Sequence, residues 1–356
     1  MVLTRADDWP IHQTSEPIAY AGTDRNFYDR YFFNGYAPDG SGFFAAAFGV
    51  YPHLDIADAH FSFIRGGTQY ALHASAELGQ ERMAMRVGPI AIEIVEPLHQ
   101  LRVTIDAAEG IAGEFTFTSR AFPLEEPRFI HRIGSRAFMD YTRMTQNGHY
   151  TGWIEVDGAR EEIAAGTMGT RDRSWGVRPI GARDPQPIPG HPVPSFFWQW
   201  TPINLEDGSL FFHINADTAG NPWNTRAAYA ADGASAGEIT EGRGVMTSTL
   251  AQGSRWPQSG TLDLAIPGAP ANLSLKPVGR FQMKGLGYTH PVWGHGIHHG
   301  ALKVEREQFD LAALDPAALD NRHVQIICAI DGDAKGVGAF EQLILGPYAP
   351  LKLEGF

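Results

Sequence analysis

The chain has 356 residues, a length typical of about two domains, and its 40 acidic against 28 basic residues give a net charge of −12. So acidic a chain repels phosphate backbones, which argues against nucleic acid as a partner. Apolar residues make up 43% and charged residues 19% of the sequence, and the 40 glycines follow no repeat, so disordered and collagen-like chains are excluded.

The first 40 residues are mostly polar and predict irregular structure, with a dense aromatic patch at residues 27–36. Apolar or alternating runs then predict strands at 43–52, 59–65, 69–76, two within 87–105, and at 113–119, 149–156 and 159–164. Gly66-Gly67 and Asp157-Gly158 are dipeptides that favour tight hairpin turns.

A proline-rich segment at 179–194 interrupts the strand pattern, so we place a boundary there between domains 1–185 and 186–356. Strands are predicted beyond it at 196–203, 209–215, 225–231, 260–266, 272–276, 299–305, 323–330 and 338–345. The one convincing helical stretch is short, 310–321, and Pro316 interrupts it.

Many strands joined by tight turns, with few helices, predict an all-β protein of two antiparallel barrels or sandwiches. The N-terminus has no apolar signal region, and no stretch is long enough to be a transmembrane helix. We therefore expect a soluble, cytoplasmic protein without an integral membrane segment. Cys328 stands in an apolar run and is expected to be a buried core residue.

The first candidate site is the charged run at 169–178, just before the proline-rich segment. Asp172 can accept a bidentate hydrogen bond from Arg171, Arg173 or Arg178, and an arginine can stack on Trp175. One interpretation is a structural lock at the domain joint. The other is the wall of a ligand cavity, where apolar surroundings raise the pKa of Asp172 and make it a general acid.

The second candidate lies on two predicted strands beyond the boundary. Trp198 and Trp200 share one strand face, and Phe211, His213 and Asn215 share a face of the next strand. The pattern fits a core with an enclosed polar pair. It equally fits a pocket whose aromatic floor binds an apolar ligand that His213 or Asn215 orients.

The third candidate is a Gly- and Pro-rich loop with four histidines in ten residues. Such a density suggests a metal site. The stretch has no cysteine and no His-x-x-x-His pair on a helix, so a structural loop, or histidines that form hydrogen bonds in a pocket, is the preferred interpretation. The aromatic and histidine residues of this loop are Tyr288, His290, Trp293, His295, His298 and His299.

Several short motifs resemble the carotenoid 1,2-hydratase and AttH-type lipocalin-like family: the turn at 146–152, the block Asp172-Arg173-Ser174-Trp175-Gly176, Trp198-Gln199-Trp200, and 205–208. The loop at 287–296 is similar to an uncharacterised bacterial branch of that family. The resemblance implies two tandem antiparallel lipocalin-like β-barrels with few short helices and an apolar cavity. Its characterised hydratases add water across an isoprenoid double bond, and related members are cyclases.

The family pattern carries over in part. Asp172, Trp175 and Gly176 match it, whereas Arg173 stands where the family has a histidine. Residues 211–215 occupy roughly the region in which the family places a tyrosine and an aspartate.

The resulting prediction is an enzyme that acts on a hydrophobic terpenoid, steroid or polycyclic molecule by acid-assisted hydration, dehydration, isomerisation or cyclisation, without an organic cofactor or a metal. A homodimer is left open. Asp172 is the first candidate acid and His213 the second. The expected substrate contacts are Arg173, Trp175, Trp198, Trp200, Phe211, Asn215, Tyr288, His290, Trp293 and His295. The alternatives are a non-catalytic carrier of lipophilic ligands, and a metal enzyme built on the loop histidines.

Overall fold

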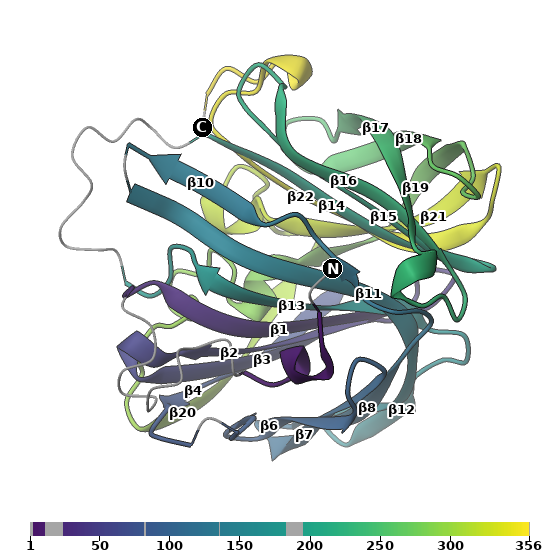
Figure 1. Ribbon diagram of the computed structural model, residues 1–356. Coiled ribbons are helices and arrows are strands. Elements are labelled where there is room, and N and C mark those ends of the chain that lie inside the picture. The colour runs from purple at the N-terminus through teal and green to yellow at the C-terminus, as the bar shows by residue number, and fades with distance from the viewer. Residues whose placement is uncertain (1–2, 11–23, 82, 135, 183–194, 356) are drawn as a thin grey trace.

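The computed structural model describes residues 3–10, 24–81, 83–134, 136–182 and 195–355. Antiparallel strands form one open sheet and one closed barrel. Figure 1 shows the barrel, green to yellow, stacked on the purple-to-teal sheet. The predicted all-β class with two tandem barrels is confirmed, the first being a curled half-barrel and the second a closed ring.

The first sheet has fourteen strands in the order β20-β4-β3-β2-β1-β13-β11-β8-β7-β6-β5, with β9, β10 and β12 also paired to β11. The strands are β1 (Phe27–Tyr36), β2 (Phe43–Tyr51), β3 (Ile56–Arg65), β4 (Thr68–Glu77), β5 (Arg86–Val87), β6 (Ile90–Glu96), β7 (Gln100–Ala108), β8 (Ile111–Ser119), β9 (Leu124–Glu125), β10 (Phe129–Ile133), β11 (Arg136–Val156), β12 (Ala159–Glu162), β13 (Met168–Val177) and β20 (Leu302–Asp310). One strand of the second half of the chain, β20, thus belongs to the first sheet.

The remaining eight strands close the barrel, with β22 pairing back to β14. They are β14 (Phe196–Leu205), β15 (Gly208–Ala216), β16 (Pro222–Ala231), β17 (Thr240–Leu250), β18 (Pro257–Ala265), β19 (Asn272–Gln282), β21 (Val324–Gly332) and β22 (Gly336–Leu345). Cys328 lies in the barrel core, and burial raises the pKa of its thiol to about 12. The domain boundary at residue 185 falls outside the described residues and stays a prediction.

The helices in the described ranges are short 3-10 turns: η1 (Arg5–Asp8), η3 (Pro52–Leu54), η4 (Ala236–Glu238), η5 (Met283–Leu286), η6 (Leu319–Asn321) and η7 (Ala349–Leu351). None of these described helices has the length and apolar character needed to cross a membrane. The predicted helix at 310–321 is wrong. Asp310 and Asp315 accept hydrogen bonds from the backbone N–H groups two residues on, and these local turns compete with helix formation.

Both hairpin predictions are confirmed. Gly66 and Gly67 join β3 to β4 with positive φ angles of 58° and 80°, and Asp157 and Gly158 join β11 to β12 with φ angles of 50° and 80°. Two successive residues with positive φ match the right-handed twist of the flanking strands.

Apolar residues form one core inside the first sheet, one inside the barrel and one between them. Strand β1 contributes Tyr31 and Phe33 to the first core and Phe32 and Tyr36 to the shared one. Because both faces of β1 are buried, its sequence has no apolar–polar alternation, and the prediction of irregular structure at 27–36 is wrong.

Candidate functional site

The layer between the sheet and the barrel contains a group of charged side chains around Asp172. On β13, Asp172 lies opposite Phe32 of β1. Residues directly opposite share a face, and Phe32 packs in the shared core, so Asp172 faces the barrel. Its side chain is partly exposed, and the charges that act on it come from both units: Arg143, Glu126, Glu341 and Arg30.

Asp172 has the chemistry of an acid that titrates near neutrality. The pKa of its carboxyl is raised to about 7, chiefly by burial. The charge of Arg143 opposes this shift, those of Glu126 and Glu341 add to it, and that of Arg30 opposes it. Among the described residues, no side chain forms a hydrogen bond or ion pair with this carboxyl. A protonated, unpartnered carboxyl group can donate its proton to a bound molecule.

The nearest arginine is already paired. Arg143 Nε donates to Glu126 Oε2 at 2.7 Å, and Oε1 of the same carboxylate accepts from Thr145 at 2.6 Å and from Trp200 Nε1 at 3.2 Å. Burial favours a higher pKa for Glu126, but the Arg143 guanidinium holds it below its usual value. Glu126 is therefore a carboxylate that neutralises Arg143.

The predicted shared faces on β14 and β15 are confirmed, and the two faces lie on the same side of the barrel wall. Trp200 is paired with His213 and Trp198 with Asn215, so these four side chains share the barrel face that meets the first sheet. Phe211 packs in the same shared core. The guanidinium of Arg143 lies 5.2 Å from the ring centroid of Trp198, which links this barrel wall to the charged group.

His213 is fully buried beside this wall. Burial lowers the pKa of its imidazole to about 4, with Glu126 acting in the opposite direction and Arg143 in the same one. His213 is therefore neutral near pH 7 and cannot serve there as a proton donor in its charged form. Its Nδ1 has no hydrogen-bond partner among the described residues.

Two further arginines meet at the loop that carries Tyr288 and His295. Arg30 and Arg178 both donate to Nδ1 of His295, the latter at 3.3 Å, while His295 Nε2 donates to the carbonyl oxygen of Leu286 at 2.9 Å. The guanidiniums lie 4.6 and 5.9 Å from the ring centroid of Tyr288. Burial is the main cause that holds the pKa of His295 well below its usual value, and the charges of Arg30 and Arg178 lower it further. The ring is therefore neutral.

The barrel adds a second buried carboxylate. Glu341 accepts from His323 Nε2 at 2.6 Å and from the side-chain amide of Gln325. The His323 ring makes edge contacts with Tyr288 and Trp198, at centroid distances of 5.0 and 5.8 Å. Glu341 thus acts on the charge of Asp172 and, through His323, contacts Tyr288 of the loop.

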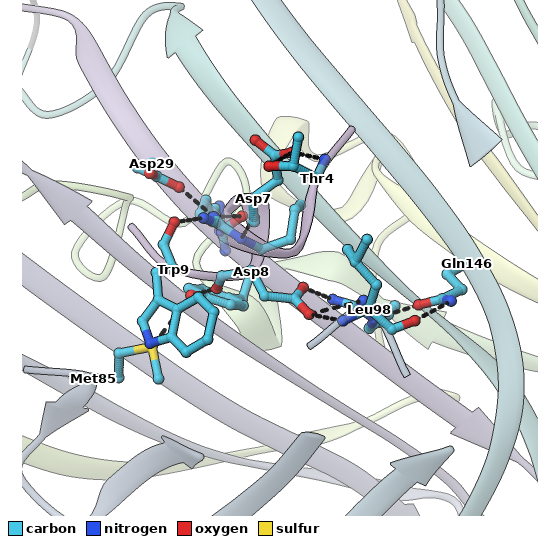
Figure 2. A network of polar contacts seen from close by, with 12 residues as sticks. Thr4, Asp7, Asp8, Trp9, Asp29, Met85, Leu98 and Gln146 are labelled. Atoms are coloured by element: carbon cyan, nitrogen blue, oxygen red, sulfur yellow. Dashed lines mark hydrogen bonds and ion pairs between the residues drawn. The ribbon is translucent and has the colours of Figure 1, made fainter. Parts of the chain in front are cut away.

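The arginines beside Asp172 in the sequence have other partners. Arg171 pairs with Asp8, and Arg173 pairs with Asp29, both fully buried on the opposite face of β13 (Figure 2). The expected bidentate bond from Arg171, Arg173 or Arg178 to Asp172 is therefore absent among the described contacts. Strand alternation directs Arg171 and Arg173 to the other face of β13, and Arg178 donates to His295 instead. The guanidinium of Arg173 does lie 5.8 Å from the ring centroid of Trp175.

Consequently Arg173 and Trp175 are not brought together with Asp172, although both were expected substrate contacts. The backbone of the N-terminal segment covers Arg173 instead, since its Nε and Nη2 donate to the carbonyl oxygens of Asp7 at 3.2 Å and Trp9 at 2.8 Å.

The histidines of the loop do not converge on one point. His290 Nε2 contacts Glu307 at 2.9 Å, His298 is exposed, and His299 packs on Trp293 at a centroid distance of 4.2 Å. His290 and Trp293 are placed instead beside the buried His73. The donor atoms of His73, His290 and Glu307 lie within 4.8 Å of one another, which is a cluster of metal-ligand types.

Five charged or polar residues of this group were not predicted from the sequence: Arg30, Glu126, Arg143, His323 and Glu341. One signal could have found two of them: a charge in the middle of a strand that is otherwise apolar or aromatic, as in Tyr28-Asp29-Arg30-Tyr31 and Ala339-Phe340-Glu341-Gln342. Such a charge is rarely buried without a partner or a function.

The fold, a curled open sheet and a closed barrel, is similar to that of solved structures with low sequence identity. An AttH-type protein from Nitrosomonas europaea is 14% identical over 94% of this chain and 97% of its own, with a TM-score of 0.56. CghA is 11% identical over 95% of both chains with a TM-score of 0.51, and its structure with Sch210972 gives 0.50. No curated protein matches the sequence. The chain belongs to DUF8625, a family of unknown function whose model matches residues 3–354.

Proposed function

We propose that the protein is an enzyme that binds a hydrophobic small molecule between the sheet and the barrel and acts on it by proton transfer. The observation that carries the proposal is Asp172, a partly exposed acid with a pKa of about 7 and no described partner, next to an aromatic wall. The fold match to CghA with Sch210972 is consistent with a ligand-binding role, by analogy of fold alone.

In this proposal Asp172 is the general acid of a hydration, dehydration, isomerisation or cyclisation. The proton leaves the Asp172 carboxyl and forms a C–H bond with the electron pair of a substrate double bond, or protonates a hydroxyl that leaves as water. The resulting cation adds water or forms a new C–C bond, and its excess proton passes to the neutral His213 or to solvent. Solvent then returns a proton to the carboxylate. His213 is neutral near pH 7, so it can accept a proton rather than supply one. Terpenoid, steroid and polycyclic molecules are the proposed substrate classes.

The test uses deuterium from solvent. The protein is incubated in D2O with a set of apolar alkenes from these classes, and the deuterium content of the products is measured by mass spectrometry. We expect the wild-type protein to add one deuterium to at least one compound, Asp172→Asn to add none, and the exposed Asp263→Asn to behave as wild type. Deuteration by folded Asp172→Asn removes Asp172 from the mechanism. Binding without turnover in the wild type identifies a carrier instead.

A further inference from the structure

Arg30 and Arg178 are two guanidiniums whose described hydrogen bonds all go to neutral acceptors. Arg30 is 1% exposed and donates to His295 Nδ1 and, at 3.2 Å, to the carbonyl oxygen of Leu286. Arg178 donates to the same His295 nitrogen at 3.3 Å. The Nε atoms of both arginines are buried and have no hydrogen-bond partner among the described residues.

Four other arginines among the described residues, whose side chains are buried or nearly so, have a carboxylate partner. Arg143 pairs with Glu126, Arg171 with Asp8, Arg173 with Asp29, and Arg120 with Asp232. Neither Arg30 nor Arg178 forms an ion pair with a described carboxylate. A buried guanidinium that forms no ion pair is unfavourable, so the position of Arg30 points to a function that needs it.

Asp58 is a buried carboxylate whose charge acts on Arg30. Its oxygens, however, contact Tyr51, His60 and the N–H of Gly296, and Arg30 contacts His295 instead. The Nε2 of His295 donates to the carbonyl oxygen of Leu286, so its Nδ1 carries a lone pair. This one nitrogen accepts hydrogen bonds from both guanidiniums. The imidazole orients both cations and neutralises neither. Two like charges are therefore held side by side against the ring of Tyr288.

We propose that Arg30 and Arg178 bind a negatively charged oxygen group of an otherwise apolar substrate. This deepens the proposed function, on which it rests, by naming the substrate class: a hydrophobic carboxylate, or a carbonyl compound that becomes an enolate. Arg30 acts on the charge of Asp172, so the bound oxygen lies in the field of the proposed acid. Guanidiniums suit this task because their donors match carboxylate geometry.

The charges around the proposed site favour a mechanism with an anionic intermediate over one with a carbocation. The carboxylates whose charges act on this group are Glu126, Glu341 and Asp58, and none of them forms an ion pair with Arg30 or Arg178. Asp172 is protonated below about pH 7. Such a site stabilises negative charge on oxygen better than a free carbocation.

In the enolate case, the neutral His213 takes a proton from the substrate and the electron pair of the broken C–H bond moves into the enolate. Asp172 then gives its proton to a carbon of the enolate, the electron pair of the C=C bond forms the new C–H bond, and the C=O bond is restored. The proton on His213 returns through solvent to the Asp172 carboxylate.

Binding of matched probes tests the proposal without knowledge of the natural substrate. The probes are 4-phenylbutyrate against 4-phenylbutanol, measured by calorimetry, and 2-naphthol, whose ionised form is read by fluorescence. Wild type should prefer the carboxylate over the alcohol by about tenfold or more, the value of one charge-assisted contact, or should bind 2-naphthol as the naphtholate. The first result assigns a carboxylate substrate and the second an enolate.

Arg178→Gln is the main variant because Arg178 is only partly buried, and Arg30→Gln is the second. Both should lose the anion preference. Arg280→Gln is the matched control, since Arg280 also stacks on an aromatic ring, Trp256 at 3.9 Å, and donates to a carbonyl oxygen without a carboxylate partner, but belongs to β19. It should bind as wild type.

Thermal melting separates binding from a structural role. Without ligand, Arg178→Gln should melt no lower than wild type, because it removes an uncompensated charge, and 4-phenylbutyrate should raise the melting temperature of wild type alone. Lower melting of both variants together with no carboxylate effect, or a wild type that shows no anion preference, overturns the proposal. Asp172→Asn should keep the anion preference, so loss of deuteration there tests the catalytic proposal separately.

Discussion

The carboxylate of Glu307 lies 2.9 Å from Nε2 of His290, whose Nδ1 accepts the backbone N–H groups of Val292 and Trp293. Because Nδ1 must carry a lone pair to accept them, the proton of the neutral ring is on Nε2 and points to Glu307. A metal bound through Nε2 needs that nitrogen deprotonated. The hydrogen bonds therefore favour a proton, rather than a metal ion, between His290 and Glu307.

We accordingly predict that the cluster of His73, His290 and Glu307 does not hold zinc tightly. After incubation with zinc and gel filtration, elemental analysis should find no stoichiometric metal in wild type, and His73→Ala should give the same value. One equivalent of zinc in wild type that His73→Ala loses contradicts this prediction.

A second prediction concerns acid. Burial lowers the pKa of both His73 and His213 to about 4, below the value of about 6.5 for an unfolded chain. The unfolded state therefore binds protons first. The stabilising contribution is complete above about pH 6.5 and is lost as the pH falls towards 4, by about 3 kcal/mol for each histidine. Urea unfolding between pH 7.5 and 4 measures the loss, which should be smaller in His213→Gln and unchanged in the exposed His298→Gln.

The third prediction is that Asp172→Asn stabilises the protein at alkaline pH. The folded-state pKa is raised, so the native state binds the proton more tightly than the unfolded chain. Stability falls as the pH rises through about 7, and Asn removes this loss, with a gain of about 2 to 4 kcal/mol at pH 8.5. Unfolding of Asp172→Asn and the control Asp263→Asn at pH 5 and 8.5 gives the comparison. Equal stability of wild type and Asp172→Asn at both pH values counts against an acid of raised pKa.

The fourth prediction concerns the N-terminal segment. Asp8 is fully buried, pairs with Arg171 and accepts the backbone N–H of Leu98 (Figure 2). Asp8→Ala leaves the Arg171 guanidinium buried without a counter-charge and should cost about 3 to 5 kcal/mol in the free energy of unfolding. The double change with Arg171→Met should recover a large part of that loss. Asp106→Ala, which breaks an exposed pair with Arg86, should cost under about 1 kcal/mol.

Local patterns predicted local structure well. The Asp157-Gly158 turn follows from backbone angles that glycine adopts easily, and the shared faces of Trp198 and Trp200 follow from strand alternation. Asp172 was predicted as a buried acid of raised pKa, but its neighbours were not. Its expected partner Arg171 binds Asp8, which is 163 residues away, and no short-range pattern encodes that choice.

β20 has a consequence for how the chain is made. Residues 302–310 pair with residues 68–76 of β4. The backbone groups at this edge of the first sheet therefore stay unpaired until most of the polypeptide has left the ribosome. Before β20 is added, the N–H and C=O groups at the edge of β4 have no partner, and strands of other chains can pair with them. Assembly of the two units is thus tied to completed translation, and a chain truncated before residue 302 should aggregate rather than yield an independent first unit.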